Sequence, residues 1–311
     1  MANCGKLLIG VDVGGTNLRV GLVDGLTVVN ETRVQANFSD LCHHNPPEQA
    51  VRAIVDSLAN ALADAIQQHP AVAAIGLGFP GFIVAGRVAQ SPNLPGLQDV
   101  DLVTPLQQQL GLPVIVENDA LAAAYGEYCL TGLQGSGLIY LGLGTGVGGG
   151  LIADGQPFPG EHGVAMEVGH IIVEPGGRPC GCGNHGCMEQ YASANGVALS
   201  YLEATGHRLT AHQIAQQVAT GDAAAVAAYA TAGDKLAQAL AHILKVVDVG
   251  TIMIGGGVSA AWHLLQPAFQ QRLQADLIPV LRDKIDIRVS QAGDQAGMIG
   301  AALLAGHQPP R

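Results

Sequence analysis

The sequence predicts an α/β fold built from two similar lobes, and two observations support this prediction. Apolar runs of strand length alternate with longer segments of helical spacing along the 311 residues, which is typical of α/β proteins. In addition, residues 8–25 and 138–155 share a glycine-rich pattern without gaps, because Gly14 and Gly144 align at an offset of 130. The repeat predicts two related lobes, each presenting a backbone turn, although chance similarity of two hairpins is an alternative.

Each copy of the repeat reads as a strand, a glycine-rich turn, a second strand and an Asp-Gly hairpin turn. The glycine-rich turns fall at residues 14–16 and 144–146, and the Asp-Gly pairs at residues 24–25 and 154–155. Outside the repeat, further strands are predicted at 73–77, 112–116, 251–254 and 285–289, and helices over 50–68, 222–247 and 298–304.

The elements suggest a division into two lobes. We expect a hinge near residue 118, with 1–118 as the smaller N-terminal lobe and 119–294 as the larger C-terminal lobe with the metal site. The last helix, at about 295–311, is expected to pack back on the first lobe.

The composition restricts the class of protein. Apolar residues at 48% and charged residues at 13% indicate an ordered globular protein. A net charge of −11 argues against a nucleic-acid partner. The sequence has no long apolar run free of glycine, so we expect no membrane span. The five residues before the first strand are too few for a signal peptide, so we expect a cytoplasmic protein.

One histidine and three cysteines form a predicted metal site. They are His170, Cys180, Cys182 and Cys187, which lie within eighteen residues and make up a complete ligand set for tetrahedral zinc. Four protein ligands leave no open position, which predicts a structural Zn²⁺ site rather than a zinc hydrolase. His185 lies in the same loop and could compete as a ligand, but its spacing to the neighbouring cysteines is cramped.

Both glycine-rich turns suit a phosphate-bearing ligand, because glycines let backbone N–H groups approach phosphates. Asp12 ends the strand before the first turn and can hold Mg²⁺ directly or through water, while Thr16 adds a hydroxyl. Residues 255–257 offer a third backbone contact, although a plain strand-to-helix turn explains them equally well.

Asn118 and Asp119 stand where a predicted strand ends and a helix begins, an edge at which α/β proteins bind ligands. They could simply cap the helix. Alternatively, Asp119 could accept the proton of a sugar hydroxyl that attacks a γ-phosphate, because phosphoryl transfer relies on positioning and charge neutralisation. Asn93, in a Pro-rich loop, is by default an Asx-turn residue.

Five motifs together resemble the ROK family of sugar kinases and sugar-responsive repressors. They are Asp12–Thr16, Glu117–Ala120, Gly144–Gly146, Glu167–His170 and Cys180–Cys187. The resemblance spans the chain. It implies the two-lobed actin-like ATPase (ribonuclease H-like) fold, with Mg·ATP in an interlobe cleft and phosphorylation of a hexose at its 6-hydroxyl.

The resemblance also implies roles by position, with Asp119 as general base. The sugar ligands would be Asn93, Asn118, Asp119, Glu167, His170 and Glu189. The Mg·ATP side would be lined by Asp12, Gly14, Gly15, Thr16, Gly144, Thr145, Gly146 and Gly256. His170 would serve both the sugar and, with the three cysteines, the zinc. Zinc would brace residues 167–189, so its removal is expected to weaken sugar binding more than nucleotide binding.

Two positions depart from the family pattern, Leu121 in place of the usual Asn and Met166 in place of the usual Gly. We expect them to repack the pocket wall. Residues 176–179 and 189–193 look most like the glucokinase members, which predicts an ATP:glucose 6-phosphotransferase of carbohydrate metabolism and glycolysis. N-acetylmannosamine, N-acetylglucosamine and fructose are alternative substrates, and polyphosphate an alternative donor. A sugar-sensing repressor would need a DNA-binding segment before the first turn, where few residues are present. We further expect a homodimer.

Overall fold

The computed structural model describes residues 6–133 and 137–307 and divides into two compact units. The first unit comprises Met1–Gly135, Gly150–Ala165 and Asp294–Arg311, and the second comprises Ser136–Gly149 and Met166–Gly293. This division differs from the predicted boundary at residue 118. The helix that follows Asn118 belongs to the first unit, because it packs against the last helix of the chain, as described below.

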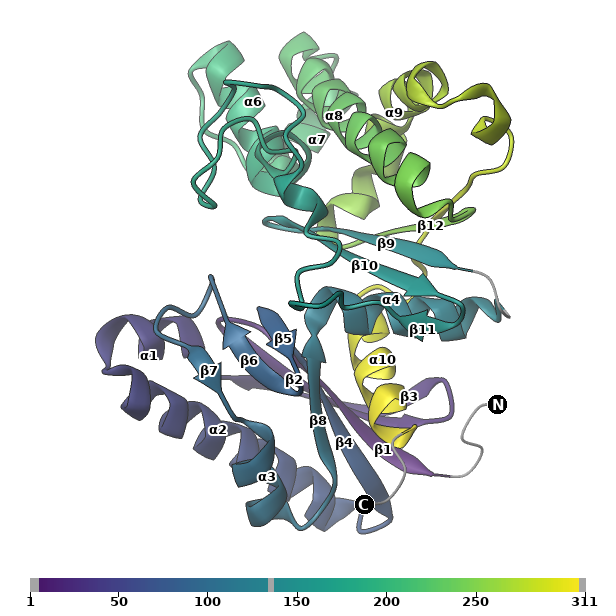
Figure 1. Cartoon of the computed structure of the whole chain (residues 1–311). Helices are drawn as coiled ribbons and strands as arrows, with labels where there is room; N and C mark the ends of the chain where they lie inside the picture. The colour runs from purple at the N-terminus through teal and green to yellow at the C-terminus, as the bar shows by residue number, and fades with distance from the viewer. Residues whose placement is uncertain (1–5, 134–136, 308–311) are drawn as a thin grey trace. The chain divides into compact units, whose positions relative to one another are not determined.

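The first unit is built on a five-stranded sheet of order β3-β2-β1-β4-β8 (Figure 1). Strands β1, β2 and β3 are antiparallel neighbours, whereas β1, β4 and β8 run parallel. The strands are β1 (Leu7–Val13), β2 (Asn17–Asp24), β3 (Thr27–Gln35), β4 (Val72–Phe79) and β8 (Val114–Asn118). A small antiparallel sheet contains β5 (Phe82–Val84), β6 (Arg87–Gln90) and β7 (Gln98–Val100).

Helices cover both faces of the five-stranded sheet because successive strand residues point to opposite sides. Ile9 and Val11 of β1 join a buried cluster that includes Leu58 of α2, while Leu8 packs with Ala302 and Ala305 of α10. The helices of this unit are α1 (Phe38–His44), α2 (Pro47–Gln68), α3 (Val103–Leu110), α4 (Asp119–Thr131) and α10 (Gln295–Gly306).

Helix α10 lies unusually close to its neighbours, and glycines make this approach possible. A Cβ at Gly10 of β1 would collide with the carbonyl oxygen of Met298, and one at Gly76 of β4 with that of Ala301. In the same way, a Cβ at Gly126 of α4 would collide with the carbonyl of Ala296. Backbone packs directly on backbone here, so no side chain can yield to make room.

We therefore expect Gly76→Ala to lower the free energy of unfolding by about 3 kcal/mol, the upper end for an overpacked site. Urea denaturation of the purified variant measures this change. Gly297→Ala on α10 is the matched control, because a Cβ there meets nothing within 4 Å. Alanine favours the helix, so the control should be unchanged or more stable by up to about 1 kcal/mol. Equal stability of the two variants would contradict the close approach.

The second five-stranded sheet has the order β11-β10-β9-β12-β13, which repeats the order of the first sheet strand for strand. The duplication predicted from the offset of 130 is thus present in the topology. The strands are β9 (Leu138–Leu143), β10 (Val147–Ala153), β11 (Gln156–Pro157), β12 (Thr251–Gly255) and β13 (Asp286–Val289). Each glycine-rich turn joins two strands as predicted, β1 to β2 and β9 to β10.

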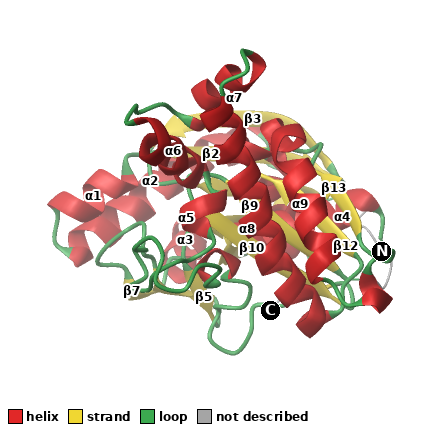
Figure 2. Ribbon diagram, turned by 90° about the horizontal axis from the view of Figure 1, so that it is seen from above, coloured by secondary structure: helices red, strands yellow, loops and turns green. Residues whose placement is uncertain are grey.

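Helices α8 and α9 lie side by side over this sheet, as both views show (Figure 1 and Figure 2). Asp222 caps α8, since its Oδ1 accepts hydrogen bonds from the N–H groups of Ala224 and Ala225. The helices of the second unit are α5 (Glu189–Ala192), α6 (Ala194–Thr205), α7 (Ala211–Ala219), α8 (Ala223–Val247) and α9 (Trp262–Asp276). Short 3₁₀ helices are η1 (Val168–His170), η2 (Gly257–Ala261) and η3 (Pro279–Leu281).

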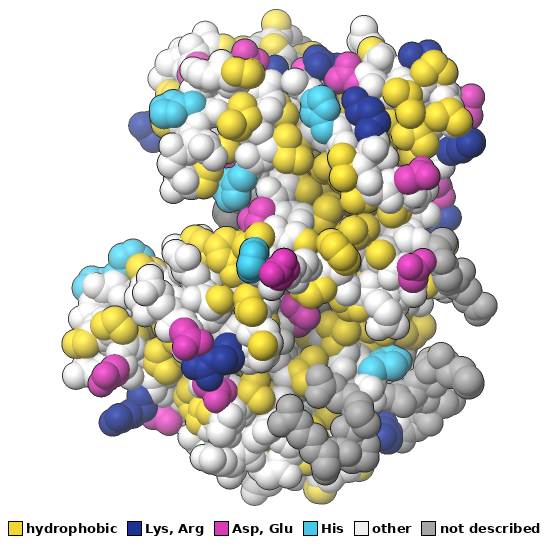
Figure 3. Space-filling view, in the orientation of Figure 1, with side chains coloured by type: hydrophobic (Ala, Val, Ile, Leu, Met, Phe, Trp, Pro, Cys, Tyr) yellow, Lys and Arg dark blue, Asp and Glu magenta, His cyan; other side chains and the backbone are white. Residues whose placement is uncertain are grey.

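The surface carries few charges, and several are paired. Figure 3 shows one face of the molecule, on which Lys and Arg side chains lie in small groups near Asp and Glu. Arg87, for example, pairs with Asp99 at 2.6 Å. Within the part of the chain that the structure describes, no helix has both the length and the apolar character that crossing a membrane requires.

Candidate active site and metal centre

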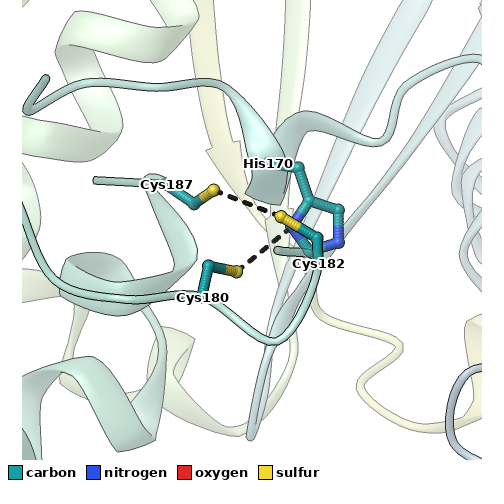
Figure 4. Close-up of side chains that lie close together, drawn as sticks. All are labelled: His170, Cys180, Cys182 and Cys187. Carbon is teal, nitrogen blue, oxygen red and sulfur yellow. Dashed lines mark hydrogen bonds between the residues drawn. The ribbon is translucent and has the colours of Figure 1, made fainter. Parts of the chain in front are cut away.

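The four predicted zinc ligands lie together in the second unit. Their ligand atoms are all within 4.8 Å of one another, and Figure 4 shows the side chains turned toward a common point. The Sγ atoms of Cys182 and Cys187 are 3.6 Å apart, as are Cys180 Sγ and His170 Nδ1. A tetrahedral zinc with Zn–S bonds of 2.3 Å needs sulfur atoms about 3.8 Å apart. The donor set therefore fits Zn²⁺, and the predicted ligands are brought together.

Tight turns bring the ligands together. The N–H of Gly183 donates to the carbonyl of Cys180, and the N–H of Cys180 donates to the carbonyl of Asn184, which folds the loop back on itself. Gly186 has a φ of 80°, and a Cβ at this position would collide with the carbonyl of Glu174. His185, the alternative ligand in the same loop, is exposed and lies outside this group of four residues.

Arg178, which sequence reasoning did not single out, connects the metal loop, residues 178–187, to helices α5 and α6. Its guanidinium donates to the carbonyl of Gln190 at 2.6 Å and to the carboxylate of Glu203 at 2.6 Å, and it stacks 4.5 Å from the centre of the Tyr191 ring. Gln190 in turn donates to Cys180 Sγ at 3.6 Å. Arginine suits this position because its planar fork can serve several acceptors at once.

Glu167 lies at the centre of a tight turn that begins at Met166. The N–H of Val168 donates to the carbonyl of Met166 at 2.6 Å, and Glu167 has φ −67° and ψ 55°, the values of an inverse γ-turn. Met166 has a φ of 65°, a left-handed conformation that costs a residue with a side chain roughly 1–2 kcal/mol. The departure from the usual glycine therefore affects the backbone, a consequence that the expected repacking of a pocket wall did not include.

The Glu167 carboxylate lies beside the His170 ring. Its Oε2 is 3.8 Å from Nε2 of His170, whose Nδ1 points to Cys180, so the two ring nitrogens have different neighbours. Burial is the main cause that raises the pKa of Glu167. His170 lowers this pKa and the nearby carboxylate of Glu189 raises it.

Glu189 is the first residue of α5 and has a backbone partner. Its Oε2 accepts a hydrogen bond from the N–H of Val147 at 2.9 Å, directly after the turn at residues 144–146. A Cβ at Gly146 would collide with this same oxygen. Gly256, at φ 78°, packs against the backbone of Leu143 and thus also borders this turn.

In the first unit, two carboxylates flank a glycine at the carboxyl ends of parallel strands. Asp12 pairs in register with Gly78, which pairs with Glu117, so the three share one face of the sheet. The backbones of the outer two strands are about 10 Å apart. Carboxylates in such a row can hold a divalent cation, which fits the predicted Mg²⁺. Sequence reasoning missed Glu117, whose position opposite Asp12 depends on strand register.

Burial raises the pKa of both carboxyl groups. Arg19, the antiparallel partner of Asp12 on β2, lowers the pKa of Asp12, whereas Asp294 and Glu31 raise it further. Arg19 pairs with Asp294 at 2.6 Å. A hydrogen bond from the N–H of Asn118 lowers the pKa of Glu117. A bound cation would favour the ionised form of both groups.

The first turn is held from outside by α1 and the loop before it. The N–H of Gly14 donates to the carbonyl of Asn17 at 2.9 Å, and the carbonyl of Gly15 accepts a hydrogen bond from the N–H of Ser39. Thr16 is exposed. The hydroxyl of Ser39 also donates to the carbonyl of Asn93 at 3.3 Å, which ties the predicted sugar loop to the same helix.

Asn118 caps helix α4, one of the two interpretations left open above. Its Oδ1 accepts from the N–H of Leu121 at 2.9 Å, and its Nδ2 donates to the carbonyl of Gly81 at 3.0 Å. Asp119 is the first residue of α4, and its Oδ1 accepts from the N–H of Ala120 at 2.8 Å.

The chain is similar to known proteins over nearly its whole length. Residues 8–308 match the ROK family. A glucokinase from Halalkalibacterium halodurans is 34% identical, with 96% of this chain and 95% of the relative aligned. An N-acetylmannosamine kinase from Escherichia fergusonii is 32% identical over 96% of this chain and 97% of its own. A crystal structure of a ROK family glucokinase from Streptomyces griseus with glucose and AMPPNP has a TM-score of 0.80 at 33% identity, covering 97% of this chain and 100% of the other.

The chain belongs to the ROK family. The predicted actin-like ATPase fold is confirmed, because the solved relative shares the fold over nearly the whole chain and the sheet order is duplicated. The first unit contains the predicted residues of the first turn together with Asn93, Asn118 and Asp119. The second contains the second turn, Gly256 and the residues at and near the metal centre.

Proposed function

We propose that the protein phosphorylates the 6-hydroxyl of a hexose with ATP, and that glucose is its preferred substrate. The observation that carries this proposal is Asp119, a carboxylate at the first residue of α4, directly after the parallel strand β8. Membership of the ROK family and 34% identity to glucokinases support a hexose kinase. The AMPPNP and glucose bound by the Streptomyces griseus relative support these two ligands.

In the proposed reaction Asp119 accepts the proton of the 6-hydroxyl as that oxygen attacks the γ-phosphorus and ADP leaves. Asn93, Asn118, Glu167, His170 and Glu189 hold the other hydroxyls. The N–H groups of the two glycine-rich turns donate to the phosphates. Mg²⁺, held through Asp12 and Glu117, neutralises phosphate charge when bound.

Zinc has a structural role in this proposal. With His170 and the three cysteines as ligands it has no open position for water, so the residues near it do the binding. The hydrolase alternative therefore has no support in the donor set.

We also propose that the protein is a homodimer. Light scattering coupled to size-exclusion chromatography measures the molar mass and so tests this proposal.

A substrate screen tests the proposed function. We expect kcat/KM with ATP to be highest for glucose, and at least about tenfold higher than for N-acetylmannosamine, N-acetylglucosamine or fructose, a difference of about 1.4 kcal/mol. N-acetylmannosamine and N-acetylglucosamine are the second candidates, because two relatives of 32% identity are named as kinases of these sugars. Polyphosphate is tested as donor in the same assay. Higher kcat/KM with an acetylated sugar would overturn glucose, and no turnover of any hexose would overturn the kinase proposal.

A further inference from the structure

Glu189, a predicted sugar ligand, also contacts the backbone next to the second glycine-rich turn. Its Oε2 accepts the N–H of Val147 at 2.9 Å, a contact between residues 42 positions apart in the chain. Val147 is the first residue of β10 and directly follows the turn of Gly144 to Gly146. The carboxylate is thus bonded to the end of one predicted phosphate turn.

A second hydrogen bond holds the other end of the same turn. The N–H of Ala194, the first residue of α6, donates to the carbonyl of Gly144 at 2.9 Å. The segment from Glu189 to Ala194 therefore grips the turn on both sides. Within the turn, the N–H of Gly144 donates to the carbonyl of Gly146 at 2.9 Å.

Gly146 is shaped for this contact. A Cβ at that position would meet Glu189 Oε2 and lie close to its carboxyl carbon, so the end of the glutamate side chain would have to move away from Val147. A side chain at residue 146 would therefore disturb the contact between Glu189 and Val147.

Glu189 is also joined to the metal loop. It comes two residues after the zinc ligand Cys187, whose side chain is fully buried, and one residue before Gln190, which contacts both Cys180 and Arg178. A shift of the metal loop must therefore move the Glu189 carboxylate, and through it the turn.

We propose that Glu189 is a positioning residue that couples the zinc-bound loop to the Gly144–Gly146 turn and so sets the affinity for the nucleotide phosphates. This coupling rests on the proposed function, in which that turn binds ATP. It adds a role in nucleotide binding to a residue otherwise assigned to the sugar.

Calorimetric titration of the zinc-loaded protein with AMPPNP and Mg²⁺, without sugar, tests the coupling. Glu189→Ala should weaken AMPPNP binding by about tenfold or more, because the turn loses a charged acceptor. Glu189→Gln keeps an acceptor oxygen and should lose less than about threefold. Glu167→Gln is the comparison variant: it should weaken glucose binding and leave AMPPNP affinity without sugar unchanged.

Hydrogen exchange of the Val147 amide provides a readout that does not depend on ligands. Exchange should be faster in Glu189→Ala and close to wild type in Glu189→Gln, with zinc content equal in all variants. Wild-type AMPPNP affinity in Glu189→Ala, with only glucose binding weakened, would overturn the coupling and leave Glu189 a sugar ligand. A wild-type protein that binds no AMPPNP would instead overturn the proposed function and with it any role in nucleotide affinity.

Discussion

Asp119→Asn is expected to lower kcat for glucose phosphorylation by about 10³-fold, with little change in the KM for either substrate. The amide has nearly the same shape as the carboxylate and can still accept the N–H of Ala120, but it cannot take a proton from the attacking hydroxyl. General-base catalysis contributes roughly 10²–10⁴-fold, which sets the size of the effect. A coupled assay of ADP release measures the loss.

The control for Asp119→Asn is Asp56→Asn, the same chemical change at an exposed position of α2. Both variants should keep wild-type zinc content and thermal stability, and the control should keep wild-type kcat. More than about one-tenth of the wild-type kcat in Asp119→Asn would show that another group accepts the proton.

Cys187→Ser is expected to lose zinc and to lower the melting temperature by about 5–10 °C. Zinc binds the thiolate of cysteine, whereas the hydroxyl of serine stays protonated and is a poor ligand. Because the Cys187 side chain is 0% exposed, that hydroxyl would also be a buried polar group. Because the unfolded chain has no formed zinc site, the free energy of zinc binding contributes to folding stability, and its loss destabilises the loop that contains the ligands. Metal content by atomic absorption and calorimetric melting give the two readouts.

The same variant tests how far the effect of zinc extends. The sequence predicted a larger loss of sugar binding than of nucleotide binding, but the contact of Glu189 with Val147 changes this expectation. We now expect both affinities to fall in Cys187→Ser. Cys129→Ser on α4 is the matched control, because Cys129 is outside the ligand group and should leave zinc content unchanged. Full zinc occupancy in Cys187→Ser would contradict the assigned ligand set.

The four residues of the candidate metal centre could be predicted because they are close in the sequence and cysteine has few other uses in such a cluster. The duplicated turns could be predicted for a similar reason, since each is a local pattern of glycines. Glu117 could not, because its position level with Asp12 depends on strand pairings through Gly78. The bond from Val147 to Glu189 likewise joins segments whose proximity is decided only by the fold.

The boundary between the units shows a second limit of sequence reasoning. Asn118 appeared to be a natural hinge because a strand ends there and a helix begins. Helix α4, however, is packed against α10 through glycines at 126 and 300, so it stays with the first unit. Such contacts between distant small residues leave no periodic pattern in the sequence. The backbone strain at Met166 is equally invisible, since only its φ of 65° reveals it.

The return of α10 to the first unit has a consequence for synthesis on the ribosome. One buried cluster joins Leu8, Val23 and Ala74 to Ala302 and Ala305 of α10. The ribosome synthesises α10 more than two hundred residues after these strand residues. At about 5–20 residues per second, this apolar face stays uncovered for roughly 10–40 s while the second unit emerges. The nascent N-terminal sheet therefore has to wait for the last helix, and in that interval it is a natural client for a chaperone.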